Sequence, residues 1–386
     1  MKRHKRVALL VQPGWFGTEV QMRGILDYAR ERGHWIIASI PENYTGTLGD
    51  LAEWKGDGAI AEVRTLRDAR LVARLSIPIV GLSGAIEEGI LPRVLTDDVE
   101  VGRIAAAHLL DCGVRRLAFV GRRGADNVNR RRAGFRERAA ALNASVATFM
   151  VPSLAATWKA WSSAVTRLEA FVRKLTPPVG VMACDDLRAR MVLEACHATG
   201  LRVPDDVAII GVDNNEPVCE FCAPPLTSVR RPDYATGYQA ARLLDRMMAG
   251  HSTQALDTRL PPDGVVKRRS TDALAVEHPH VRAAVQYIRD HAGEDFGVES
   301  VVEAVPISRR WLETEFRETM GCTLHEHICR VRVEKAKQIL VHQPTRKLRD
   351  VSAVCGFTSP KRFRIVFQRL TGLTPAAFRK AREQTR

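Results

Sequence analysis

The chain has 386 residues, of which 45% are hydrophobic and 26% are charged, and it carries a formal net charge of +14. This length exceeds the roughly 250–300 residues that one hydrophobic core usually serves, so the sequence predicts more than one domain. The composition excludes a disordered or collagen-like chain. No apolar run reaches the ~18 residues that a membrane-spanning helix needs.

The positive charge is concentrated toward the C-terminus. Residues 280–386 contain 20 Lys and Arg against 12 Asp and Glu, and residues 1–279 contain 38 against 32. A concentrated basic segment suits a polyanion such as nucleic acid. The charge alone would equally suit an acidic membrane surface.

The N-terminus and the cysteines narrow the class of protein further. The apolar run Val7–Val11 is too short for the core of a signal peptide, so we expect a cytoplasmic protein. The eight cysteines are scattered, and Cys219 and Cys222 form a lone CxxC. Because no second pair or suitably spaced histidine completes a metal set, we expect neither a metal nor a cofactor.

Short apolar strands alternate with helical segments through the first two thirds of the chain. The expected strands are Val7–Val11, Ile36–Ile40, Ala59–Val63, Ile77–Leu82, Val94–Thr96, Leu117–Val120, Ala147–Val151, Gly180–Ala183 and Val207–Val212. The expected helices are Thr18–Arg32, Gly49–Lys55, Leu66–Leu75, Val99–Cys112, Arg131–Leu142, Trp158–Leu175, Leu187–Thr199 and Tyr234–Met248. This alternation predicts parallel sheets with helices on both faces. The segment is too long for one simple sheet, so we expect two.

Polar residues follow several of these strands, where open α/β sheets bind their ligands. The candidate ligand-binding residues are Trp15, Phe16, Asp97, Arg131, Asp185 and Asp213. Carboxylates accept hydroxyl protons, arginine donates a fork of N–H groups, and aromatic faces pack on C–H surfaces, so the set suits a neutral polyhydroxy compound. The aspartates could equally be helix caps or turn residues.

An enzyme is the competing interpretation of the same residues, because paired acids can perform general acid–base work. The chain has no GxGxxG after its first strand, no Walker loop, no GxSxG elbow and no HExxH. We therefore expect a binding cleft rather than an enzyme.

Residues Pro261–His278 contain turn residues and charge rather than periodicity, which indicates a join between domains. Helical patterns follow it. The expected helices are Val281–His291, Val298–Val305, Ser308–Thr319, Thr323–His342 and Leu348–Cys355, and a last one begins at Pro360. Two successive pairs of these helices, Val298–Val305 with Ser308–Thr319 and Leu348–Cys355 with the helix from Pro360, have the form helix, turn, helix. The two pairs lie about fifty residues apart in the chain.

The second pair shows the pattern most clearly. Gly356 can adopt the positive φ of a tight turn, and Ser359 is a good N-cap before Pro360. The second helix is expected to bury Phe363, Val366, Phe367 and Leu370. A basic face opposite an apolar one is typical of a helix that enters the DNA major groove, although an ordinary solvated face gives the same pattern.

The outward faces of both second helices supply the candidate DNA contacts. Those expected to reach base edges are Arg310, Thr314, Arg317, Lys361, Ile365 and Gln368. Those expected to meet phosphates are Arg362, Arg364 and Arg369.

The first two thirds of the chain resemble a known family. Val94–Gly121 (VLTDDVEVGRIAAAHLLDCGVRRLAFVG), Asn129–Phe135 (NRRRAGF) and Val181–Val229 are similar to the LacI/GalR and periplasmic sugar-binding family. The resemblance implies a periplasmic-binding-protein-like α/β domain of two Rossmann-like lobes with parallel sheets, joined by three crossovers, with a sugar in the cleft. It places Asp97, Arg131, Asp185 and Asp213 at ligand-facing positions, although asparagine is commoner than aspartate at position 185.

Residues 280–386 resemble the AraC/XylS DNA-binding domain, an all-α domain with two helix-turn-helix motifs. GFTSPKRFRIVFQRLTGLTPAAFR and ISRRWLETEFRETMG carry the resemblance. It implies a sugar-binding domain at 1–270, a linker at 271–279 and a DNA-binding domain at 280–386, with helix-turn-helix units near 298–319 and 348–370.

The order of the two domains resembles that of xylose operon regulators. That likeness implies a dimeric, sugar-responsive activator of transcription that binds D-xylose and double-stranded DNA and acts with RNA polymerase. The alternatives are a regulator that senses another sugar and a sugar-modifying enzyme with a basic tail.

Overall fold

The structure is a computed structural model that describes residues 4–11, 17–39, 48–86, 90–151, 157–252, 256–272, 278–343 and 345–383. The chain folds into two compact units. Residues 1–110 and 115–273 form the first unit, and residues 274–386 with 111–114 form the second.

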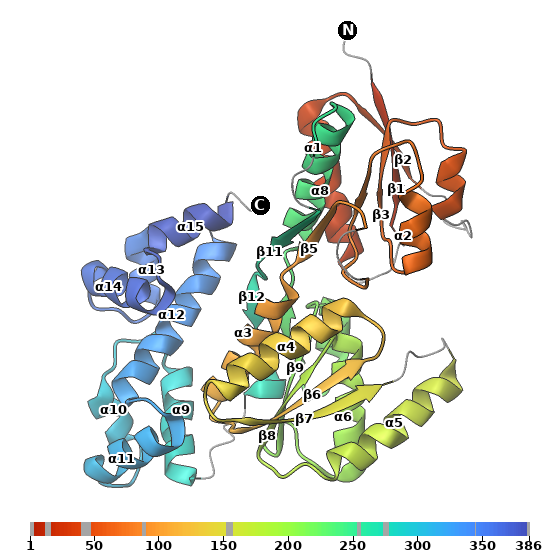
Figure 1. Cartoon of the computed structure of the whole chain (residues 1–386). Coiled ribbons are helices and arrows are strands. Elements are labelled where there is room, and N and C mark those ends of the chain that lie inside the picture. The colour runs from red at the N-terminus through yellow and green to blue at the C-terminus, as the bar shows by residue number, and fades with distance from the viewer. Residues whose placement is uncertain are drawn as a thin grey trace. The chain divides into compact units, whose positions relative to one another are not determined.

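The first unit contains two six-stranded sheets (Figure 1). The first sheet has the order β11-β5-β4-β3-β1-β2, and its strands pair in parallel. These strands are β1 (Lys5–Leu10), β2 (Trp35–Ser39), β3 (Gly58–Ala61), β4 (Ile79–Gly81), β5 (Arg93–Thr96) and β11 (Asp257–Leu260). Helices α1 (Thr18–Arg32) and α8 (Asp233–Met248) cover one face, and α2 (Leu66–Val72) with the 3₁₀ helix η1 (Leu48–Ala52) covers the other. We call this the first lobe.

The second sheet has the order β12-β10-β9-β8-β6-β7. Its strands are β6 (Arg116–Arg122), β7 (Ser145–Val151), β8 (Val179–Ala183), β9 (Val207–Val212), β10 (Thr227–Arg230) and β12 (Gly264–Val266). Only the pairing of β12 with β10 is antiparallel among the described pairs. The helices of this second lobe are α3 (Asp98–Asp111), α4 (Asp126–Ala140), α5 (Trp158–Val172), α6 (Asp186–Thr199) and α7 (Glu216–Phe221). Two parallel-dominated sheets confirm the predicted fold class.

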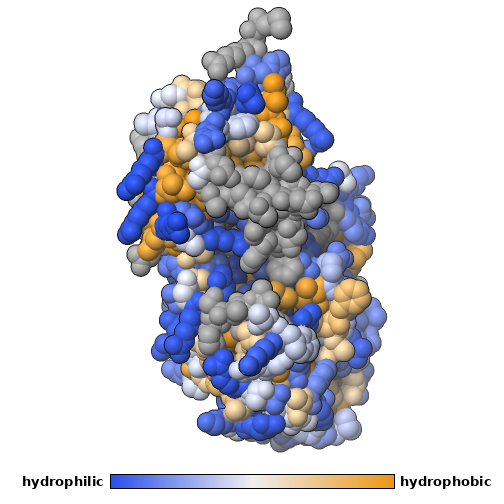
Figure 2. Space-filling view, turned by 90° about the vertical axis from the view of Figure 1, so that its right-hand side faces the viewer, coloured by the Kyte–Doolittle hydropathy of each residue, from blue (hydrophilic) through white to orange (hydrophobic). Residues whose placement is uncertain are grey.

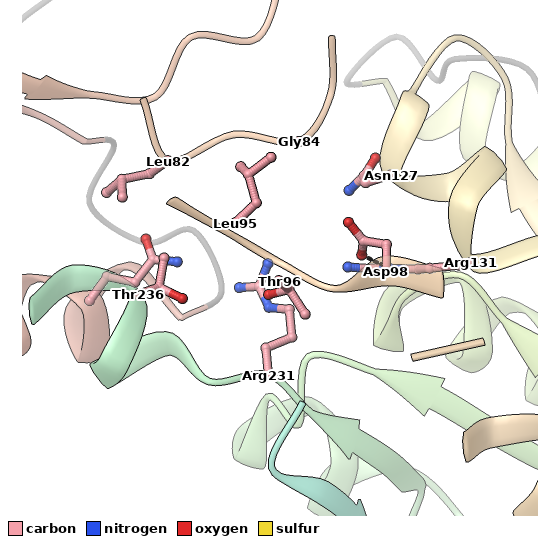
Figure 3. A pocket seen from close by; sticks show the side chains of 10 residues that line it. Leu82, Gly84, Leu95, Thr96, Asp98, Asn127, Arg131, Arg231 and Thr236 are labelled. Atoms are coloured by element: carbon pink, nitrogen blue, oxygen red, sulfur yellow. Dashed lines mark hydrogen bonds and ion pairs between the residues drawn. The ribbon is translucent and has the colours of Figure 1, made fainter. Parts of the chain in front are cut away.

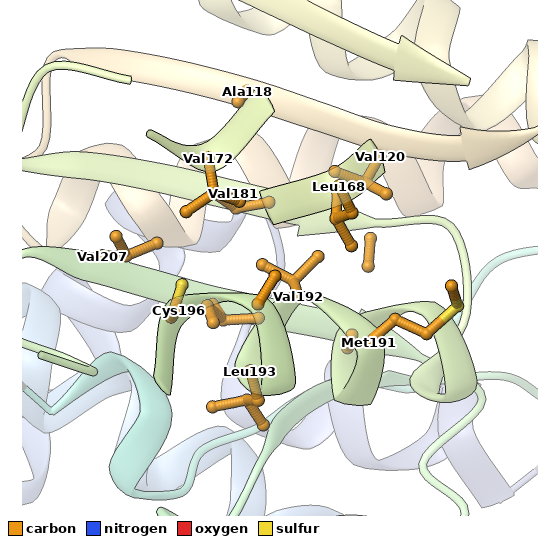
Figure 4. Close-up of a cluster of buried hydrophobic side chains, with 14 of the residues drawn as sticks. Ala118, Val120, Leu168, Val172, Val181, Met191, Val192, Leu193, Cys196 and Val207 are labelled. Carbon is orange, nitrogen blue, oxygen red and sulfur yellow. The ribbon is translucent and has the colours of Figure 1, made fainter. Parts of the chain in front are cut away.

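The core of the second lobe lies between its sheet and helices α5 and α6 (Figure 4). Val181 and Val207 from the strands pack with Leu168 from α5 and with Val192 and Cys196 from α6. All five side chains are fully buried. Full burial of one such aliphatic side chain contributes about 1.5–3 kcal/mol, so this cluster holds the helices on the sheet.

The chain crosses between the lobes three times. It passes from β5 to α3, from β10 to α8, and from β11 to β12. The crossings are joined by backbone hydrogen bonds, because Asp97 N donates to Leu260 O at 2.7 Å and Asp263 N donates to Arg230 O at 2.9 Å. In each lobe, the chain is therefore hydrogen-bonded to another crossing where it leaves the sheet. We call the three crossings together the hinge between the lobes.

The second unit is helical in its described part (Figure 1). Its helices are α9 (Pro279–Asp290), α10 (Val298–Glu303), α11 (Arg309–Met320), α12 (Leu324–His342), α13 (Leu348–Val354), α14 (Pro360–Thr371) and α15 (Pro375–Glu383). Two separate apolar clusters lie around α11 and around α14, and α12 contributes to both. The α10–α11 and α13–α14 pairs are the two predicted helix-turn-helix units.

The turn between α13 and α14 follows the prediction from sequence. Gly356 has φ of 69°, and a Cβ at this position would lie 2.3 Å from Glu294 O, so no other residue fits without a shift. Ser359 Oγ accepts a hydrogen bond from Arg362 N, and Pro360 starts the helix. Leu370 is different from the expectation, because its side chain is 39% exposed and contributes little to the core.

The expected start of one helix was wrong. Helix α4 begins at Asp126, so Arg131 lies inside the helix and not at its start. The polar run before Arg131 concealed that first turn. The segment interpreted as a join begins with β12 and the 3₁₀ helix η2 (Arg269–Thr271), whose polar groups are satisfied by neighbouring strands, and the boundary between the two units falls inside it, after residue 273. Strands this short carry too few residues for a periodic signal.

The surface shown in Figure 2 is mostly hydrophilic, with apolar residues in separate patches. None of the helices in the described ranges has the length and apolar character to span a bilayer.

Candidate ligand cavity and nucleic-acid interface

A cavity lies between the two lobes of the first unit, beside the crossings (Figure 3). Its described lining residues are Gln21, Leu82, Gly84, Leu95, Thr96, Asp98, Asn127, Arg131, Arg231 and Thr236. The first lobe contributes residues from α1, α8 and the ends of β4 and β5, and the second lobe contributes residues from α3 and α4. Most of the lining is polar, with only two leucines.

A buried ion pair forms one wall of the cavity. Arg131 Nε donates to Asp98 Oδ1 at 2.7 Å, and both side chains are 4% exposed. The guanidinium also donates to the carbonyl oxygen of Cys184. Its Nη1 lies 3.9 Å from Asp213 Oδ1. Arg131 therefore connects α4 to the start of α3 and to the ends of β8 and β9.

A second, partly buried arginine lies at the crossing after β10. Arg231 Nε is 3.2 Å from Asp213 Oδ1, and its Nη2 is 3.1 Å from Asp233 Oδ1. Gln21 Nε2 donates to the same Asp233 oxygen at 2.8 Å. Buried charges are tolerated when each is paired in this way. Two arginines and three aspartates thus form one network that includes groups from both lobes.

Three members of the network, Asp213, Arg231 and Arg131, have shifted pKa values. Burial raises the pKa of Asp213 to about 6, and the neighbouring Arg231 and Arg131 only partly offset that effect. Burial alone would lower the pKa of Arg231, but the carboxylates of Asp233 and Asp213 outweigh it and the pKa is raised. The same balance, with Asp98 as the first partner, raises the pKa of Arg131. Both arginines stay charged at every physiological pH.

The lobes touch at one side of the cavity. Asn127 N donates to Gly84 O at 2.9 Å, and Asp126 N donates to Ala85 O at 3.1 Å. A Cβ on Gly84 would lie 3.3 Å from Asn127 Cβ. The start of α4 therefore packs against the loop after β4, and a side chain at Gly84 would require Asn127 to shift by a few tenths of an ångström.

The structure brings together only part of the predicted ligand set. Arg131 and Asp213 lie in the network. Asp97 accepts backbone hydrogen bonds from Val99 and Glu100, so its carboxylate caps α3. Asp185 caps α6 by accepting from Arg188 N at 2.9 Å. Neither carboxylate is part of the described cavity lining.

The two predicted aromatic contacts, Trp15 and Phe16, lie outside the described residues. The cavity lining also includes residues outside the predicted ligand set: Gln21, Asp98, Asn127 and Arg231. Asp98 adjoins the selected Asp97, and Arg231 directly follows a strand. Both residues lie next to the end of a strand, and this position is the signal by which the sequence could have selected them.

The predicted DNA contacts all lie on exposed faces of α11 and α14. The exposed residues are Arg310, Thr314, Arg317, Lys361, Arg362, Arg364, Ile365, Gln368 and Arg369. Ile365 is 55% exposed, which is unusual for isoleucine in a packed helix. Opposite this face, Phe316 in α11 and Phe367 in α14 are fully buried.

Two of these side chains are engaged within the second unit. Thr314 Oγ1 donates to Arg310 O at 2.9 Å, and Arg362 Nη2 lies 2.9 Å from His325 Nε2. Arg309 was not selected, and it pairs with Glu313 at 2.9 Å and with Glu299 at 3.3 Å. Arg310 rather than Arg309 is therefore the available cation at the start of α11.

A two-lobed α/β unit with a charged cavity, followed by two helix-turn-helix units with basic faces, defines a DNA-binding transcription regulator with a ligand-binding domain. Residues 106–271 match the periplasmic binding protein-like domain, and residues 301–381 match a helix-turn-helix domain.

Individual relatives identify the family. The chain is 31% identical to the xylose operon regulatory protein of Escherichia coli strain K12, over 98% of this chain and 97% of that one. The namesake protein of Haemophilus influenzae is 27% identical over 87% of each chain. The solved structure of a xylose-binding transcription activator matches with a TM-score of 0.63 and 30% identity, over 98% of this chain and 99% of that one. The chain belongs to the family of xylose operon regulatory proteins. These relatives are named as regulators, in agreement with the expectation that the chain is not an enzyme.

Proposed function

We propose that the chain senses D-xylose and activates transcription of genes for xylose use. The sugar binds in the cavity between the lobes, in a domain formed by residues 1–270. Its binding changes how residues 280–386 engage DNA. The observation that carries this proposal is the match to xylose operon regulators over nearly the whole length of both chains.

The chemistry of the cavity supports a neutral polyhydroxy ligand. Asp98 offers acceptors for hydroxyl protons, and Arg131, Arg231 and Asn127 offer donors. Asp213 is outside the described lining and contacts both arginines. Because these groups already pair with one another in a network of two arginines and three aspartates, a neutral ligand can exchange hydrogen bonds with them without adding a further buried charge. Asp97 and Asp185 remain candidates for contact if the caps they form open on binding, and Trp15 or Phe16 would supply the ring contact.

The exposed faces of α11 and α14 support insertion of two helices into successive turns of the major groove. Arg310, Arg317, Lys361 and Gln368 have the donors that base edges accept, and Ile365 could contact a thymine methyl group. Thr314 would reach a base with its methyl group, since its hydroxyl is bonded within the helix. Arg362, Arg364 and Arg369 would contact phosphates.

The proposal includes a homodimer that works in the cytoplasm and recruits RNA polymerase. These elements follow from the family's role as activators and from the need of a DNA-binding regulator to reach the chromosome.

Calorimetric titration of the full chain with D-xylose, L-arabinose, D-ribose and D-glucose tests the ligand. We expect heat and saturable binding with D-xylose. Binding of another sugar with none of D-xylose would reject xylose and leave a regulator of the same architecture. Turnover of any of these sugars would instead favour an enzyme.

A further inference from the structure

The last described segment of the first unit is hydrogen-bonded to the second lobe. Ser270 Oγ donates to Ile209 O at 2.6 Å and accepts from Thr227 N at 2.8 Å. Thr271 Oγ1 lies 2.9 Å from both Thr227 Oγ1 and His108 Nε2. Ser270 and Thr271 are at most 2% exposed. The 3₁₀ helix η2 is therefore a fixed part of the second lobe, and the chain leaves the unit directly after it.

The loop after β9 forms the edge of the charged network. Asp213 and Asn214 have φ of 110° and 51°, two successive non-glycine residues with positive φ. Such backbone costs on the order of 1–3 kcal/mol per residue and persists only where its surroundings hold it. Here Asn214 N donates to Ser228 Oγ at 2.9 Å, and Asn215 N donates to Asp186 Oδ2 at 2.7 Å.

One arginine joins this loop to the exit segment. Arg268 Nη1 donates to Asn214 Oδ1 at 3.0 Å and to Leu226 O at 3.0 Å, and its Nε pairs with Glu220. The Arg268 side chain is only 11% exposed, whereas that of Glu220 is 54% exposed. The backbone of Arg268 is also held, because its N–H donates to Thr227 Oγ1 at 2.8 Å.

We propose that Asn214 and Arg268 are positioning residues that pass the state of the cavity to the segment leading out of the first unit. This inference rests on the proposed function, because it assumes that a ligand in the cavity controls the second unit. The route has two steps. Asp213, at the cavity network, shares the strained backbone with Asn214, and the Asn214 side chain holds the guanidinium that precedes η2.

The physical basis is a difference in the Asp213 contacts between the empty and the occupied cavity. A ligand hydroxyl that accepts from Arg131 or Arg231 in the cavity lining competes with Asp213 for the same guanidinium. Any shift of Asp213 changes the φ of the strained pair, and the short side chain of Asn214 transmits that change to Arg268. A ligand can shift such an equilibrium only by its different affinity for the two states.

The test compares sugar binding with the sugar-induced change in DNA binding. The variants are Asn214→Gly, which keeps the positive φ and removes the amide, and Arg268→Gln, which removes the guanidinium. Glu220→Gln is the matched control, because it removes the charge of the exposed partner of the same arginine and leaves the bond to Asn214. Each full-length variant is titrated with D-xylose by calorimetry. It is then titrated onto a duplex selected by the full-length protein from random DNA, with and without D-xylose.

We expect both variants to bind D-xylose with an affinity within about threefold of that of the original chain. Their Tm should lie within a few degrees of its Tm. The sugar-induced change in DNA affinity, typically 5–150-fold for an allosteric pair, should fall at least fivefold in both and stay unchanged in Glu220→Gln. The double variant should lose no more of the sugar-induced change in DNA affinity than either single variant loses. Full retention of the sugar response in Asn214→Gly and Arg268→Gln would overturn the inference, and so would an equal loss in Glu220→Gln. Absence of any sugar response in the original chain would instead reject the proposed function on which the inference rests.

Discussion

Arg131 of α4 and Asp98 of α3 form a buried ion pair at the hinge, with a 2.7 Å hydrogen bond and 4% exposure on each side. The same two helices are joined a second time at the surface, where Arg103 Nη2 lies 3.0 Å from Glu137 Oε2 with 42% and 59% exposure. The chain thus contains two arginine–carboxylate pairs between one pair of helices, and they differ mainly in burial.

Removing one partner from each pair should give very different losses of stability. Asp98→Asn leaves the buried Arg131 without its main counter-charge and should lower the free energy of unfolding by roughly 3–5 kcal/mol. Glu137→Gln should cost less than about 1 kcal/mol, because solvent screens an exposed pair. Urea denaturation of both variants measures the difference, and equal losses would contradict the structural role given to Asp98.

The raised pKa of Asp213 makes the stability of the first unit depend on pH. An unfolded aspartate binds a proton only below about pH 4, whereas burial allows the folded Asp213 to hold it up to about pH 6. The folded state therefore binds more protons in this window, and the contribution of Asp213 to stability is complete below pH 4 and lost as the pH rises through 6.

Asp213→Asn should remove this dependence, because an amide does not titrate. The unfolding free energy of the original chain minus that of the variant should fall by on the order of 1–3 kcal/mol between pH 4 and pH 7. Denaturation curves at four pH values in that window measure the slope. A difference that is flat or rises with pH would show that the folded carboxyl is ionised throughout.

The exposure of Leu370 gives a direct test of the α14 core. Phe367 is fully buried among the apolar residues around α14, and Leu370 is 39% exposed. Phe367→Ala should cost about 3–5 kcal/mol through the cavity it leaves, whereas Leu370→Ala should change stability by less than about 0.5 kcal/mol. Thermal unfolding of the two variants compares them. A large loss in Leu370→Ala would restore the expectation that this side chain packs inward.

Substitutions on α14 should separate readers of sequence from phosphate contacts. Gln368→Ala should weaken binding by about 1–3 kcal/mol and relax the preference at one base pair, whereas Arg369→Ala should weaken all duplexes alike and reduce the salt slope by about one. Lys337→Ala on α12 serves as the control, because its amine pairs with Glu334 at 2.9 Å. Fluorescence anisotropy with a set of single-base variants at several salt concentrations measures both effects. A uniform loss for Gln368→Ala would exclude it as a reader of bases.

The sequence predicted the architecture well because its signals are local. Alternating apolar runs define the two sheets, and a serine cap, a proline and a glycine define the start of α14 and the turn before it. Each of these depends on a few neighbouring residues. The structure confirms the cap at Ser359 and the positive φ of Gly356.

The cavity was harder to predict, because the side chains of neighbouring residues at a crossing between the lobes have different directions. Asp97 and Asp98 are adjacent and chemically identical, yet the first caps α3 and the second pairs with Arg131. Which one faces the cavity depends on where α3 begins and on how α4 packs beside it. Likewise, the role of Arg231 depends on Asp213, which lies in another element. Such contacts between distant parts of the chain leave no periodic pattern in the sequence.

The pair of reading helices has a consequence for the form of the operator. Helix α11 presents Arg310, Thr314 and Arg317, and α14 presents Lys361, Ile365 and Gln368. If both faces read bases as proposed, we expect the two stretches of duplex that one chain contacts to differ in sequence, because the side chains on the two helices differ. Such an element would have a polarity along the double helix, and inverting it would turn the bound chain to face the other way relative to the start of the gene.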